Sequence, residues 1–262
     1  MLFRSRTYVP SNTGTADGSD YDCETDIGIY EDNYSITEKP CVKLRTKSLE
    51  PLFKGKVDSL NKPAVYSLNY ESGFFQTKAS ATTSTLYPKA APLPNTHTIT
   101  YVPPSSVSLV HVHNDTFIDE LGDERHTVKM LSPGDLFTFM GKFQDNALAA
   151  GVPAEDTYAM MISRQGTYCL KITASGPLTT LSREQKSAFF KEYDKNAKIL
   201  YSDLELTDTA NQDKLEHLLL DLLKEFFLDD KIGLFKATNA DLTEWNQKKL
   251  NTAGVIETVP CI

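Results

Sequence analysis

Two histidines, His111 and His113, end an apolar run of sequence SVSLV and stand two positions apart. Side chains at positions i and i+2 of a β-strand point to the same face, so both imidazoles can reach one ion. A catalytic zinc site takes three protein ligands and leaves its fourth position to water, and a carboxylate is a suitable third donor. Asp135 stands at the predicted start of the next helix, on what would be the rim of a cleft. We therefore expect His111, His113 and Asp135 to bind one Zn2+ ion.

The candidate site residues occur along the chain in the same order as in a known family of enzymes. H-x-H at 111–113, followed by S-x-x-D at 132–135 and preceded by a glutamate, Glu71, on a predicted strand, resembles the JAMM (JAB/MPN) metallopeptidases. The resemblance covers roughly residues 45–175. More loosely, the layout of the chain from residue 41 onward looks like JAB-like C-terminal domains of bacterial, often Bacteroidetes, surface or polymorphic-toxin-type proteins.

The resemblance implies a role for each matching residue. His111, His113 and Asp135 match the zinc ligands of the family. Ser132 matches the serine that helps to stabilise the oxyanion, and Glu71 matches the glutamate that activates water. The implied activity is hydrolysis of a peptide or isopeptide bond, in which zinc lowers the pKa of its bound water towards about 7 and the glutamate carries the proton to the leaving amine. The expected partner is a peptide or protein substrate.

Two features depart from the family pattern. Asn114 stands where the family commonly has proline, and a long acidic segment, Asn114–Leu131, replaces the usual short gap before the serine. This segment contains His126, which is an alternative ligand. Glu50 also precedes the histidines, but it lies in a predicted helix beside Pro51, away from any strand.

Each candidate also has a purely structural interpretation. A pair of histidines is often an ordinary polar strand edge, Glu71 could be a solvent-facing strand residue, and Ser132 with Asp135 forms a helix start with a capping box. The capping role is compatible with metal binding. Two other functions therefore remain open: a non-catalytic binding or structural module that keeps the fold, with the 114–131 segment covering the cleft, and a metal-dependent hydrolase acting on something other than an amide.

Hydrophobic periodicity predicts the elements that position these residues. The order of elements is helix, strands, helix, strands and helices, which favours an α/β layered sandwich around a mixed β-sheet. The resemblance makes this JAB/MPN-like and cytidine-deaminase-like. The expected helices span 41–61, 136–150, 183–197 and 211–228, and the expected strands span 64–70, 73–78, 96–102, 106–112, 157–163 and 167–173, with a short closing pair of strands formed by residues 232–237 and 254–259.

The same patterns divide the chain into three parts. Residues 1–40 are polar and acidic and are expected to form a weakly ordered arm. Residues 41–178 are the JAMM/MPN-like metal-binding part. Residues 179–262 are a helical C-terminal extension with short closing strands, packed on the same domain.

Composition restricts the partners and the location of the protein. The 262 residues carry a net charge of −8 and no basic stripe, which disfavours nucleic acid. No stretch is long and apolar enough for membrane insertion, and the first residues lack the apolar core of a secretory signal, so we expect a cytoplasmic protein or one exported by a non-classical route. Four scattered cysteines form no metal or redox motif. A Cys23–Cys41 bridge is compatible with the sequence, although reduced, unpaired cysteines would suit the cytoplasm.

Overall fold

The computed structural model describes residues 38–90, 99, 102–118, 122, 124–176, 178, 180–202 and 209–261. Its centre is a seven-stranded sheet with strand order β1-β2-β5-β6-β7-β8-β9. β2 and β5 are parallel and every other neighbouring pair is antiparallel, so the sheet is mixed. The strands are β1 (Gly73–Thr77), β2 (Ser106–Val112), β5 (Tyr158–Ser163), β6 (Gly166–Ile172), β7 (Ile232–Ala237), β8 (Trp245–Leu250) and β9 (Ile256–Pro260).

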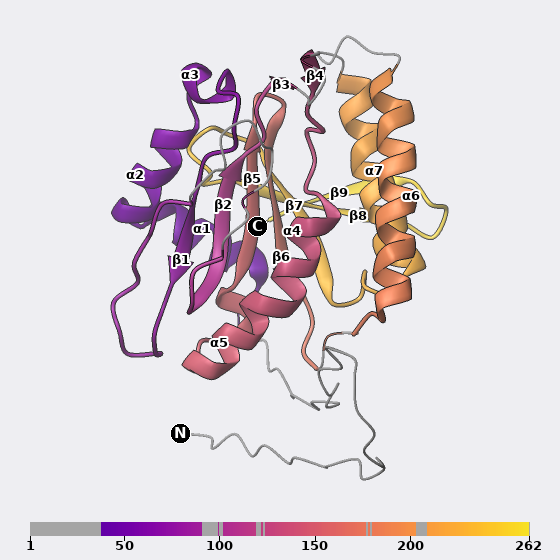
Figure 1. Cartoon of the computed structure of the whole chain (residues 1–262). Coiled ribbons are helices and arrows are strands. Elements are labelled where there is room, and N and C mark those ends of the chain that lie inside the picture. Colours follow the sequence, from indigo (N-terminus) through magenta and orange to yellow (C-terminus); the bar gives the residue numbers. More distant parts are fainter. Residues whose placement is uncertain are drawn as a thin grey trace, which may run out of the picture.

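Helices cover both faces of the sheet, which confirms the expected α/β layered sandwich (Figure 1). One face packs against α1 (Pro40–Leu49), α2 (Pro51–Leu60) and the single turn α3 (Pro63–Tyr66). The other face packs against α4 (Pro133–Thr138), which continues through a π-helical turn (Phe139–Phe143) into α5 (Gln144–Ala150), and against α6 (Arg183–Ser202) and α7 (Thr209–Glu225).

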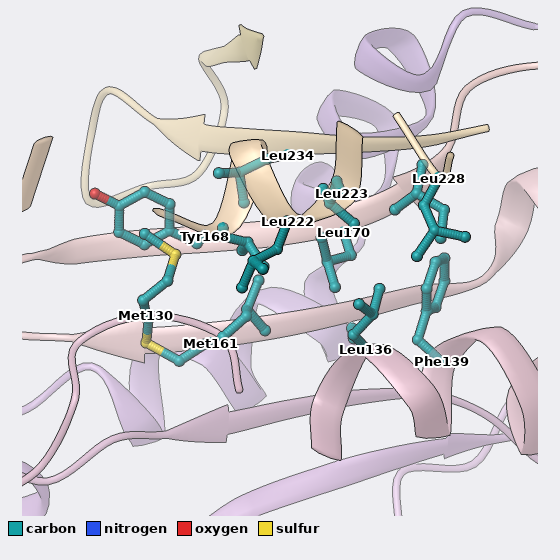
Figure 2. Close-up of a cluster of buried hydrophobic side chains, with 14 of the residues drawn as sticks. Met130, Leu136, Phe139, Met161, Tyr168, Leu170, Leu222, Leu223, Leu228 and Leu234 are labelled. Carbon is teal, nitrogen blue, oxygen red and sulfur yellow. The ribbon is translucent and has the colours of Figure 1, made fainter. Parts of the chain in front are cut away.

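The larger apolar core lies between the sheet and the helices α4 to α7. Figure 2 shows Leu136 and Phe139, from the helical segment after Ser132, facing Leu222 and Leu223 of α7 across strand residues such as Leu170. All five of these side chains are buried. Alternation along each strand sends the intervening residues to the opposite face, where they meet α1 and α2.

The expected helices at 41–61, 136–150, 183–197 and 211–228 are confirmed, with the first one interrupted at Glu50-Pro51. The strands expected at 73–78 and 106–112 are confirmed, as is the hairpin of 157–163 and 167–173. A small separate sheet, β3 (Thr116–Ile118) with β4 (Glu124–His126), forms within the 114–131 segment. The expected arm at 1–40 and the expected strand at 96–102 lie almost entirely outside the described residues.

The strand expected at 64–70 is wrong. Pro63 opens a helical turn instead, because its fixed φ suits the first position of a helix and Lys62 before it is extended. The following residues turn back towards β1. The C-terminal part also differs, since it contributes three strands, β7, β8 and β9, which continue the main sheet from β6.

A disulfide joins Cys41 in α1 to Cys261 just after β9, with the two Cα atoms 5.3 Å apart. The expectation of unpaired cysteines is therefore wrong for these two residues, and Cys41 is not available to Cys23, which lies outside the described part. Sequence spacing could not show this pair, because 220 positions separate the two cysteines and only the fold brings them together. Cys169 is free and buried.

Candidate metal centre

The register of β1 on β2 places three of the predicted residues at one end of the sheet. Gly73 pairs with His111, and the amide of Val112 donates to the carbonyl of Ser72 at 2.8 Å. Counting outward along both strands, Glu71 comes opposite His113, and Glu71 Oε1 lies 3.7 Å from His113 Nε2. Glu71 therefore precedes β1 rather than lying within a strand, but the antiparallel pairing still carries it to the histidines.

The two histidines face each other from the end of β2. Their Nε2 atoms are 3.0 Å apart, and the side chains are almost fully buried, at 1% exposure for His111 and 6% for His113. Nδ1 of His113 lies 2.6 Å from the carbonyl oxygen of Val128. Because a carbonyl oxygen only accepts, Nδ1 carries the proton, and the lone pair of Nε2 is directed at the cluster, where His111 Nε2 is its neighbour.

Asp135 reaches the histidines from the first turn of α4. Ser132 is the N-cap, and its hydroxyl accepts from the amide of Asp135 at 3.2 Å in a capping box. In return, Asp135 Oδ2 accepts from the amide and the hydroxyl of Ser132 at 2.7 Å and 2.8 Å. This leaves Oδ1 pointing at His111, 3.3 Å from Nε2, while Oδ2 lies 3.9 Å from His113 Nε2.

These distances fit a metal ion. Glu71, His111 and His113 offer donor atoms that all lie within 4.8 Å of one another. Two ligands of a tetrahedral zinc ion with bonds of about 2.0–2.1 Å stand about 3.3–3.4 Å apart. The histidine pair at 3.0 Å and the His111–Asp135 pair at 3.3 Å are close to that spacing. The histidines are thus common to two donor sets, one completed by Asp135 and one by Glu71.

Burial and mutual charge shift the pKa values of the cluster strongly. Burial raises the pKa of Glu71 to about 8. Burial acts to lower the pKa of His111, but the Asp135 carboxylate outweighs it and raises this pKa to about 9. Burial and the neighbouring His111 lower the pKa of His113 to about 4. Burial would raise the pKa of Asp135, yet the charge and hydrogen bond of His111 hold it far below its usual range. Such opposed shifts within one cleft are typical of functional sites.

The other candidates lie at varying distances from the cluster. Ser132 lines the adjoining cavity, but its hydroxyl proton is directed at Asp135. His126, the alternative ligand, ends β4 with an exposed side chain at the wall of that cavity. Glu50 caps α1 and pairs with Lys47, away from the histidines. His217 bonds the carbonyl of Gly254, and His97 lies outside the described residues.

A cavity of about 690 Å³ opens beside the cluster. Its walls include Phe190, Tyr193 and Lys198 of α6, which sequence reasoning missed. No local signal could have found them, because α6 reaches the site only through the packing of the C-terminal part on the sheet. The carbonyl of Val128, which orients His113, was also missed, because only the folded path of the 114–131 segment brings it to the histidine.

Comparison of the chain with protein-family models, with curated proteins and with solved structures finds no match. Among the helices that the structure describes, none combines the length and the apolar character needed to cross a membrane.

Proposed function

We propose that this protein is a zinc-dependent hydrolase of the JAMM (JAB/MPN) type that cleaves a peptide or isopeptide bond. The observation that carries the proposal is the convergence of two buried imidazoles, a carboxylate held by Ser132 in a helix cap, and a carboxyl of raised pKa, all in the lining of one cavity. His111, His113 and Asp135 would hold the ion. When bound, zinc would supply Lewis acidity, which makes water a nucleophile near neutral pH.

Glu71 is suited to move the proton. Glu71 as a residue is 7% exposed and its carboxyl lies beside His113, so burial keeps its pKa close to the pH at which it must work. A group with such a pKa can take a proton from water and return it to the leaving amine, which contributes about 10²- to 10⁴-fold in rate. His113 is held in the tautomer that leaves Nε2 free, and Asp135 is held by two bonds from Ser132.

Ser132 would stabilise the oxyanion only after a rotation of its hydroxyl. That hydroxyl now donates to Asp135 Oδ2, while the backbone amide of Ser132 donates to the same oxygen. When the hydroxyl turns towards a substrate oxygen, Asp135 keeps one of its two bonds from Ser132, the one from the backbone amide. A donor already aimed at the oxyanion typically contributes about 3 kcal/mol to the transition state, so a hydroxyl that must first leave Asp135 would contribute less.

The first test measures zinc content by elemental analysis. Purified protein saturated with zinc is expected to hold one equivalent, Asp135→Ala to lose it, and Glu71→Gln to retain it. His217→Ala, which alters a histidine outside the cluster, is the matched control. Loss of zinc in Glu71→Gln with retention in Asp135→Ala would assign the third ligand to Glu71 instead. Wild-type protein without zinc affinity would contradict the proposal.

The second test follows cleavage of peptide and isopeptide substrates. Wild type and the control Glu50→Gln should cleave, whereas zinc-loaded Glu71→Gln should be slower by about 10²-fold or more. Zinc binding with no hydrolysis of either substrate would favour a binding or scaffold module. Equal cleavage by wild type and Glu71→Gln would remove Glu71 from the mechanism.

A further inference from the structure

The cavity beside the metal centre is much larger than the hydrolytic cluster requires. At about 690 Å³ it falls within the size range of sites that enclose whole ligands. The cluster forms only part of its lining. Apolar side chains form much of the rest, including Phe75, Leu109, Met130 and Phe190.

The pairing of β1 with β2 sets the position of two apolar lining residues, Phe75 and Leu109, relative to the histidines. Leu109 precedes His111 by two positions on β2, so both side chains lie on the same face about 7 Å apart. Phe75 of β1 pairs directly with Leu109, just as Gly73 pairs with His111. Two residues before His111 on β2, the polar cluster therefore gives way to two buried apolar side chains, Leu109 and its partner Phe75 on β1.

The facing wall comes from α6, outside the region that carries the family resemblance. Tyr193 anchors this helix, because its hydroxyl donates to the carbonyl of Leu131 at 3.1 Å, directly before the cap of α4. Phe190 lines the cavity and is still 49% exposed. At the rim, Lys198 donates to Asp194 at 2.6 Å. An exposed aromatic ring and an ion pair of the same helix thus line the cavity together with the cluster.

We propose that this cavity binds a large apolar side chain of a peptide substrate, one or two residues away from the bond that is cleaved. The spacing supports an extended peptide, since two residues of such a chain span about 7 Å, the step from His111 to Leu109. The apolar side chain would cover Phe75, Leu109 and Phe190. The charged rim and Thr138 suit the polar backbone of a peptide better than a hydrocarbon chain. The identity of the occupant as a substrate depends on the proposed function, whereas its binding does not.

The test uses the full chain carrying Glu71→Gln, loaded with zinc, so that bound peptides are not consumed. The probe is a library of acetylated octapeptides with randomised positions, and retained peptides are identified by mass spectrometry. Retained peptides are expected to be enriched in Phe, Tyr, Trp, Leu or Met at one position. Adding Phe190→Ala should weaken binding of an enriched peptide about tenfold. Ile199→Ala, which removes an exposed apolar side chain of the same helix outside the cavity lining, should leave binding unchanged.

A second variant guards against indirect effects on folding. Thr138→Trp would fill the cavity from α4 and should abolish the enrichment while zinc remains bound. The proposal would be overturned if the Glu71→Gln protein retained no peptides enriched in apolar side chains. Equal peptide binding after Phe190→Ala and after Ile199→Ala would overturn it as well. Enriched peptides that bind but are not cut by wild-type protein would support this binding site and contradict the hydrolase instead.

Discussion

Gly73 on β1 lies directly opposite His111 on β2, a candidate metal ligand, and the two backbones approach so closely that no side chain fits between them. A Cβ at position 73 would lie 2.5 Å from the carbonyl oxygen of Val110 and 3.0 Å from both Cα and Cβ of His111. The pairing that brings Glu71 to the cluster therefore requires glycine at this position.

Gly73→Ala is expected to disturb both stability and zinc binding, because the added methyl group must push β1 away from His111. We expect a loss of about 1–3 kcal/mol in the free energy of unfolding and weaker zinc binding. Urea unfolding and a zinc titration measure the two effects. The control is Gly55→Ala in α2, where nothing lies within 4 Å and the change should stabilise the helix by up to about 1 kcal/mol. Unchanged zinc affinity in Gly73→Ala would contradict this account of the register.

Ser132→Ala is expected to weaken both the start of helix α4 and the position of Asp135, the proposed zinc ligand. The hydroxyl of Ser132 caps α4 and orients Asp135, so its loss should cost about 1 kcal/mol of stability and weaken zinc binding. Ser182→Ala is a matched control, because Ser182 makes the same kind of capping bond to the amide of Gln185 in α6. It should lose similar stability but keep its zinc affinity. Equal zinc affinity in both variants would show that the backbone amide of Ser132 alone holds Asp135.

The stability of the metal-free protein is expected to fall as the pH rises from about 6.5 to about 8. Burial raises the pKa of Glu71 to about 8 and the Asp135 carboxylate, against burial, raises that of His111 to about 9, so the folded state keeps protons that the unfolded chain releases at lower pH. Each such group lowers the free energy of unfolding by up to about 1.4 kcal/mol per pH unit. Urea unfolding after removal of metal by a chelator measures the slope.

Two comparisons check the origin of this slope. Glu71→Gln should show a shallower fall, because one titrating group is gone. Saturating zinc should make the fall shallower, since His111 must lose its proton to bind the ion and zinc binding therefore strengthens with pH. Metal-free wild-type protein whose stability rises across this window would contradict the assigned pKa directions.

Reduction of the Cys41–Cys261 disulfide is expected to destabilise the fold without abolishing the metal centre. The bond closes a loop across 220 positions and joins α1 to the end of the sheet, far along the chain from the histidines. Its loss should lower Tm by roughly 5 to 15 °C. Thermal unfolding with and without dithiothreitol measures this. Cys261→Ser should match the reduced wild type and be insensitive to the reductant, and a wild-type Tm that does not change on reduction would show that the bond contributes no stability.

Residues close together in the sequence were sufficient to predict the parts of the site that form locally. His111 and His113 share a face because a strand has a two-residue period, and Ser132 with Asp135 forms a helix cap because their spacing allows reciprocal bonds. The amphipathic helices and the hairpin at 157–173 followed from patterns of the same short range. The prediction of a strand at 64–70 is wrong although it also relied on a local pattern, because Pro63 favours a helical turn there.

Tertiary structure alone decided what depends on distant segments meeting. The antiparallel register of β1 on β2 brought Glu71 to His113, and packing of α6 on the sheet brought Phe190 to the cavity. Proximity after folding paired Cys41 with Cys261. Local propensities act over a few residues, whereas strand register and helix packing are set by burial of apolar surface shared among many elements, which no single segment encodes.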